Sequence, residues 1–178
     1  TDPLNPGFIQ PSVSSGTLTF RALADTLREY ILSDASSYFK PVFVERVANQ
    51  DLHSLLPADM VILAHPLFAE EAARLATFHS QHNDLSVIVV QPQAVYNEFS
   101  SGAQDISAIR DFMKMLWHKG GEGNKPRFML LFGDASYDYK NRVAENTNFI
   151  PTFQAPGSLH PVTSYATDDF FGCIDDNE

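Results

Sequence analysis

The feature that most constrains the fold is an alternation of apolar runs with helical segments between residues 58 and 132. The runs cover residues 60–64, 86–90 and 127–132. Continuous apolar runs of this length are typical of strands covered on both faces. A helix is expected from about residue 68 to residue 82, because its apolar residues fall on one face. The members of that face are Phe68, Ala72, Leu75, Ala76 and His79.

A second helix is expected over residues 106–117, between the second and third runs. Its apolar residues recur at helical spacing and form one stripe. The stripe consists of Ile109, Phe112, Met113, Leu116 and Trp117. Asp105 precedes the stripe, where its carboxylate can accept from unpaired first-turn amides. Strands alternating with helices predict an α/β fold of Rossmann-like type, with a parallel sheet, flanking helices and right-handed crossovers.

Residues 1–57 are expected to form a leader and a small β-rich segment. Residues 16–23 alternate polar and apolar side chains, as a half-buried strand does. Residues 28–32 could pair with them through a turn at residues 24–26. A helix over residues 18–32 competes with this hairpin, since the apolar spacing also fits a helix; the β-rich start at residues 17–20 favours the hairpin. Residues 39–47 are expected to be extended.

After residue 132 the chain loses its periodicity. Residues 133–178 are predicted to be mostly loop, with short extended pieces at 149–151 and around 170–171. So long an irregular segment is unusual inside a compact domain, and it indicates a functional surface or a missing partner region.

Composition excludes several classes of function. The net charge of −10 would repel a phosphate backbone, so no nucleic-acid partner is expected. No apolar run approaches the roughly 18 residues needed to span a bilayer, and the first residues do not read as a signal peptide. Both chain ends look arbitrary, so we expect a piece of something longer. The single cysteine, Cys173, excludes an internal disulfide framework and a cysteine-rich zinc site.

Three loops should leave the carboxyl ends of the strands, where open parallel sheets carry their functional groups. They are residues 65–66, 91–93 and 133–138. In the third loop, Asp134 and Asp138 could bind a cation or orient a histidine. Alternatively, Gly133 supplies a tight exit from the strand and Asp134 caps a turn.

Five carboxylates crowd the last dozen residues, and oxygen donors at this density could hold calcium. They are Asp168, Asp169, Asp175, Asp176 and Glu178. Their spacing matches no EF-hand loop, and the alternative is a solvated acidic run. Calcium at Asp168 and Asp169 is therefore only a weak candidate, and no other metal or cofactor is expected.

Recognised catalytic and nucleotide-binding motifs are missing from the sequence. The glycines at 120–123 precede a strand and read as a helix C-terminal break, and neither a P-loop nor a Gly-x-Ser-x-Gly elbow occurs. The six histidines show no metal-ligand spacing. Cys173 could act as a nucleophile with a histidine, but its acidic neighbours disfavour a thiolate, and a small semi-buried core cysteine is the preferred interpretation.

Several stretches of the sequence resemble one protein family. The run VYNEFSSGAQDISAIRDF at residues 95–112 resembles the gingipain-like cysteine peptidases. ADMVI at 58–62, LLFGDASYDY at 130–139 and YATDDFFG at 165–172 support the resemblance in the family's order. Upstream, REYI at 28–31 and NQDLH at 49–53 are also similar to sequences of this family.

The resemblance implies a caspase-like fold of two α/β subdomains. Residues 58–140 would be the Rossmann-like first subdomain, residues 141–178 the start of the second, and residues 1–57 the end of an upstream β domain. The family's catalytic histidine lies in a His-Gly segment and its cysteine follows a later strand. No histidine here precedes a glycine, and Cys173 does not occupy the nucleophile position. The resemblance thus implies a peptidase parent and a fragment without catalytic residues, in which Asp134 and Asp138 could support the active site.

Within the family, the sequence is most similar to sortase-like signal peptidases of the type IX secretion system. This implies a location at the cell surface, outer membrane or periplasm. The implied partners are the missing catalytic subdomain, cargo proteins with C-terminal secretion signals, and type IX secretion components. A non-enzymatic assembly module that docks secretion partners, and a self-contained hydrolase using Cys173, are the two alternatives.

Overall fold

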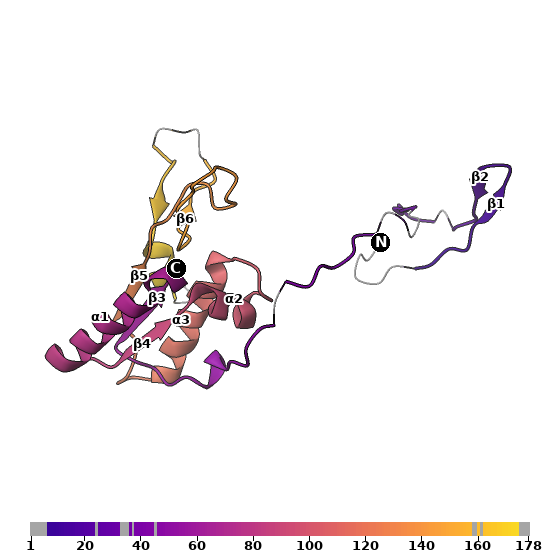
Figure 1. Ribbon diagram of the computed structural model, residues 1–178. Helices are drawn as coiled ribbons and strands as arrows, with labels where there is room; N and C mark the ends of the chain where they lie inside the picture. Colours follow the sequence, from indigo (N-terminus) through magenta and orange to yellow (C-terminus); the bar gives the residue numbers. More distant parts are fainter. Residues whose placement is uncertain are drawn as a thin grey trace. The chain divides into compact units, whose positions relative to one another are not determined.

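The computed structural model describes residues 7–23, 25–32, 36, 38–44, 46–157, 160 and 162–174. The chain divides into two compact units, Thr1–Val47 and Ala48–Glu178; Figure 1 labels their elements. Within the described ranges, no helix has both the length and the apolar character needed to cross a membrane.

A parallel three-stranded sheet forms the centre of the second unit, with the order β4-β3-β5. Strand β3 (Met60–Ala64) pairs on one side with β4 (Val87–Val90) and on the other with β5 (Phe128–Phe132). The three predicted strands are therefore confirmed, and so is the α/β fold class.

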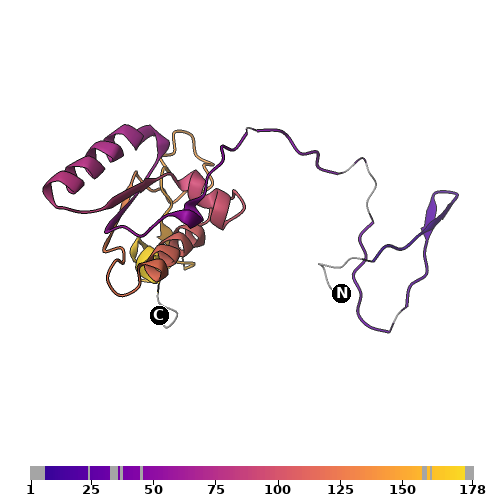
Figure 2. The ribbon, with the colours of Figure 1, turned by 90° about the horizontal axis from the view of Figure 1, so that it is seen from below.

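Helices connect the strands and cover both faces of the sheet (Figure 2). Between β3 and β4 lie the 3-10 helix η2 (Pro66–Phe68) and α1 (Ala69–His82), which packs on the face of Met60, Ile62 and Ala64. Between β4 and β5 lie α2 (Pro92–Phe99) and α3 (Ile106–Gly120), which pack on the opposite face, where Val61 and Leu63 are fully buried. The predicted helix near residues 68–82 is confirmed.

Helix α3 forms as its sequence predicts. The Asp105 carboxylate accepts from the Ser107 amide at 2.8 Å and caps the amino end. Gly121 follows the last turn at φ 57°, a left-handed conformation that glycine adopts without steric cost. Of the predicted stripe, Ile109, Phe112, Met113 and Leu116 are buried, and Trp117 is half-buried.

The segment before α3 differs from the prediction. Residues 91–93 are predicted to be a loop, but α2 occupies Pro92–Phe99. Pro92 takes the first helical position, where its fixed φ and missing N–H cost nothing. The helix ends at Ser100, and Ser101 and Gly102 turn the chain with φ of 55° and 86°.

The tail is better packed than the sequence suggests. The expected extended pieces at 149–151 and 170–171 are wrong. The tail strands β6 (Phe153–Gln154) and β7 (Ala166–Thr167) pair antiparallel, and residues 170–171 lie in the 3-10 helix η3 (Asp169–Gly172). Ile150 and Phe171 are each 1% exposed and belong to the core beneath α2 and α3.

The first unit carries a hairpin, but its two strands are not the predicted pair of residues 16–23 and 28–32. Strand β1 (Ser12–Ser14) pairs with β2 (Thr17–Thr19), and residues 28–32 belong to no strand. Ser15 and Gly16, both at positive φ, make the short turn that selects the nearer partner. Neither the competing helix nor a strand at 39–47 forms among the described residues; Ala24 and Glu45 lie outside them.

Candidate functional site

The predicted functional loops converge at one edge of the sheet. The register aligns Leu63 with both Val90 and Leu131, so the three strands end together. The His65 amide donates to the Phe132 carbonyl at 3.4 Å and joins the first loop to the third. The carboxyl edge of the sheet is defined here as residues 65–66, 91–93 and 133–139.

His65 is fixed within an aromatic cluster at this edge. Its ring centroid lies 4.8 Å from that of Phe149, which also meets Phe68 edge-on at 5.3 Å. Nδ1 of His65 accepts from the Leu67 amide at 3.3 Å and caps η2. The ring therefore has a structural role in the fold of this edge.

Gly133 lets the tail approach the end of β5. A Cβ atom there would lie 2.9 Å from Cγ1 of Ile150 and 3.0 Å from Cβ of Phe149. Since real Cβ atoms do not come so close to other side chains, any larger residue would force Ile150 or Phe149 to shift. The predicted tight exit at this position is confirmed.

Asp134 ties its loop to the segment that follows. Its carbonyl accepts from the amides of Phe149 and Ile150 at 2.9 and 3.1 Å. Its carboxylate accepts from the Ala135 amide and from the Thr147 hydroxyl, both at 3.0 Å. These bonds join the loop to residues 147–150 and do not cap a turn, and support of an active site by Asp134 stays a prediction.

Asp138 closes a second turn in the same loop region. Its carboxylate accepts from the Val143 amide at 2.7 Å, and its carbonyl accepts from the Asn146 side chain at 2.6 Å. Across the loop, the Gln104 amide donates to the Tyr139 carbonyl at 3.2 Å. This bond links the edge to the segment between α2 and α3, and active-site support by Asp138 likewise stays a prediction.

The acidic tail is only partly described. Asp168 accepts from the Thr152 hydroxyl at 3.0 Å, and the Asp169 amide donates to the Thr167 hydroxyl at 3.1 Å. Within the part of the chain that the structure describes, no three His, Cys, Asp or Glu side chains gather as metal ligands. Asp175, Asp176 and Glu178 lie outside that part, so calcium at Asp168 and Asp169 stays a prediction.

Cys173 is exposed, which corrects the expectation of a semi-buried core residue. Phe171 fills the core and Ile174 packs against it, while Cys173 between them is exposed. The Cys173 thiol lies 3.4 Å from the carbonyl of Asp169, one turn earlier.

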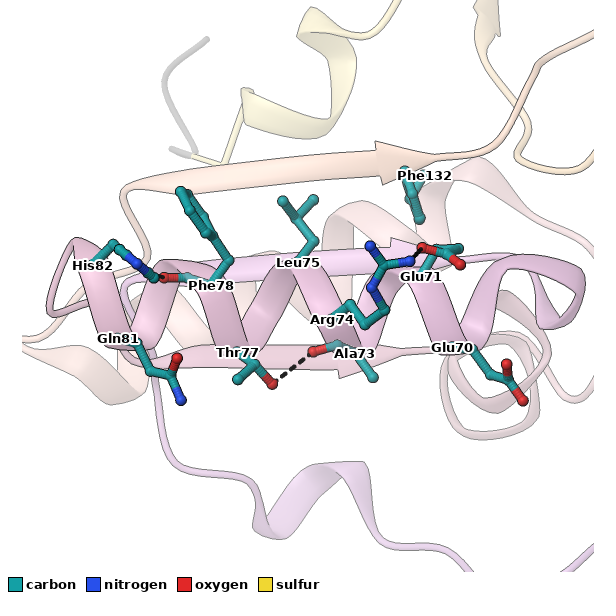
Figure 3. Close-up of a pocket in the computed structure, with 10 residues that line it drawn as sticks. All are labelled: Glu70, Glu71, Ala73, Arg74, Leu75, Thr77, Phe78, Gln81, His82 and Phe132. Carbon is teal, nitrogen blue, oxygen red and sulfur yellow. Dashed lines mark hydrogen bonds and ion pairs between the residues drawn. The ribbon is translucent and has the colours of Figure 1, made fainter.

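A groove between α1 and β5 was not predicted from the sequence. In Figure 3, Leu75 and Phe78 of α1 point toward β5, and Phe132 points back toward the helix. Phe78 and Phe128 are each about half exposed. Among the described residues β5 pairs only with β3, so its other edge has no strand partner. The sequence carries no signal for this groove, because all five residues of β5 are large and apolar and do not show which of them face α1.

The fold agrees with the family to which the sequence points. The chain belongs to Peptidase family C25, whose model matches residues 53–178. Among solved structures, it is similar to dimeric latent PorU from Porphyromonas gingivalis, with 39% identity and a TM-score of 0.62. The match covers 74% of this chain and 13% of that one, so the chain spans a small part of that protein. No curated protein matches. The predicted gingipain-like family and caspase-like fold are confirmed.

Proposed function

We propose that this chain is the scaffold half of a gingipain-like cysteine endopeptidase and carries no catalytic residue itself. The observation that supports the proposal is that the polar side chains at the carboxyl edge are engaged in structural contacts. There, His65 caps a helix and packs among aromatic rings, Asp134 binds the Thr147 hydroxyl, and Asp138 closes a turn. These side chains stabilise the loops of the edge. Such a role fits a scaffold on which a catalytic half assembles.

The groove along β5 is the proposed contact for that catalytic half. Its floor is apolar, from Leu75, Phe78 and Phe132, and the neighbouring strand edge offers unpaired backbone groups among the described residues. A strand from the rest of the parent polypeptide would satisfy those groups and cover the apolar side chains together. A second copy of the chain is a poorer occupant, because two bodies of charge −10 repel each other.

In the assembled parent, we propose that a cysteine thiolate outside this chain attacks a peptide carbonyl. Backbone amides hold the oxyanion, and a histidine protonates the departing amine as the scissile C–N bond breaks. The resulting thioester is released by water or by an amine acceptor, as in a sortase. The proposed substrates are cargo proteins of the type IX secretion system, cut before their C-terminal signal at the cell surface, outer membrane or periplasm.

A split-protein assay tests the proposal. The chain and the remainder of its parent are produced separately, mixed, and assayed for peptide hydrolysis and co-elution. Activity is expected only in the mixture. Phe132→Asp in the groove is expected to abolish co-elution, whereas Ser80→Asp, a control at an exposed position of α1 that does not line the groove, leaves it unchanged.

Two results would overturn the proposal. Cleavage by the isolated chain would favour the self-contained hydrolase. Binding of secretion components by the chain, without any complementation of the remainder, would favour the assembly module.

A further inference from the structure

Residues 50–55 lie against α2 and α3 and are called the strap here. They include the 3-10 helix η1 (Leu52–Ser54). Leu52 and Leu55 pack on the core beneath α2 and α3. The strap precedes β3 by a few residues and follows the boundary between the two units, which falls after Val47.

Glu98 of α2 holds the strap by its backbone. Its carboxylate accepts from the Leu52 amide at 2.7 and 2.9 Å and from the His53 amide at 3.2 Å. Gln50 Nε2 and His53 Nδ1 add contacts at 2.8 and 2.7 Å. The Glu98 side chain is only 15% exposed. Burial acts to raise the pKa of Glu98, but the hydrogen bonds from Leu52, Gln50 and His53 outweigh it and lower the pKa to about 2.

Two further contacts fix the strap to its surroundings. Lys119, near the end of α3, donates to the carbonyls of His53 and Leu55. The His53 ring stacks on Phe99 with centroids 4.6 Å apart and planes 11° apart. Glu98 of α2 therefore binds amides of the strap, and Lys119 of α3 binds its carbonyls.

A chain of side-chain amides leads from the strap to the carboxyl edge. Gln50 donates to the Ala94 carbonyl at 2.7 Å and accepts from Asn97 at 3.3 Å. Gln93, a residue of the edge, donates to Asn97 at 3.0 Å and to the Gly102 carbonyl at 3.2 Å. The segment after Gly102 then reaches the loop at 133–139 through the bond from Gln104 to Tyr139.

We propose that the strap is a conformational latch, and that Glu98 is the positioning residue that couples its seating to the order of the carboxyl edge. With the strap seated, α2 and residues 100–104 are held and Gln104 orders the loop at 133–139. With the strap released, the apolar side chains of Leu52 and Leu55 leave the core and this order is lost. The two arrangements of the strap are the switching element that coupling between distant sites requires.

Hydrogen exchange of the 178-residue chain tests the latch without any assay of activity. Glu98→Gln keeps the shape of the side chain but removes its charge and one acceptor, leaving strap amides unpaired. The amides of Leu52 and His53 are expected to exchange at least about tenfold faster. The amide of Val143, which reports on the edge through Asp138, is expected to accelerate as well. Glu71→Gln, which disturbs a surface pair on α1, is the matched control and should change neither.

Gln104→Ala and Lys119→Met separate the two parts of the proposal. Gln104→Ala should accelerate exchange at Val143 and leave Leu52 unchanged. Lys119→Met should reproduce the pattern of Glu98→Gln, and it replaces that variant if Glu98→Gln does not fold. Unchanged exchange at Leu52 in both strap variants would refute the latch. Faster exchange at Leu52 with Val143 unaffected would refute the coupling. Because these readouts require no catalytic half, they do not depend on the proposed peptidase function.

Discussion

Truncation of Phe171 tests whether the irregular tail is part of the core. Its side chain is 1% exposed and lies in the cluster that contains Ile109, Phe112 and Ile150. Removing a buried phenyl ring costs the transfer free energy of its atoms and the energy of the cavity that remains, about 3–5 kcal/mol for Phe→Ala. For a domain of this size, we expect a fall in melting temperature of roughly 10–15 °C.

Urea denaturation of Phe171→Ala gives the loss of unfolding free energy directly. Phe128→Ala is the matched control, because Phe128 is 51% exposed on β5; its loss should stay near 1 kcal/mol. If Phe171→Ala costs no more than this control, the tail folds independently of the α/β layers and the packing argument is refuted.

Two further predictions concern charge and close packing. The pKa of Glu98 is about 2 in the folded chain against an ordinary 4.5, so its contribution is present above pH 4.5 and is lost as pH falls toward 2. We expect this loss to be on the order of 2 kcal/mol after solvent screening, and to be missing from the pH profile of Glu98→Gln. Gly133→Ala should lower the free energy of unfolding measured in urea by about 1–3 kcal/mol, because the added Cβ would meet Ile150. An unchanged free energy of unfolding would mean that the tail shifts there without cost.

The periodic parts of the fold were predictable from the sequence because their signal is local. The apolar run at Met60–Ala64 and the stripe of α3 depend on residues close in the chain, and both match the structure. The tail was not predictable in this way. Ile150 and Phe171 each belong to a short apolar pair without strand or helix periodicity, and contacts with the core beneath α2 and α3 decide that they are buried.

Helix α2 was missed for a related reason. The polar residues of α2 show no helical pattern in the sequence. In the structure, Asn97 and Glu98 form hydrogen bonds with Gln50, more than forty residues earlier. Part of the run that identifies the family therefore has a packing role that no local pattern reveals. The loop that contains Asp134 was foreseen from its place after a strand, whereas the groove beside Phe132 was visible only once α1 lay against β5.

The central claim, that catalysis resides outside this chain, is tested most directly by replacing its one cysteine. The measurement is kcat/KM for peptide cleavage by the full parent protein carrying Cys173→Ala, with its melting temperature as a control for folding. Because Cys173 is exposed and is not assigned to the nucleophile position, we predict a kcat/KM within about twofold of the unmodified protein, or about 0.4 kcal/mol. A loss of about 1,000-fold or more at an unchanged melting temperature would make Cys173 the nucleophile and contradict the scaffold role.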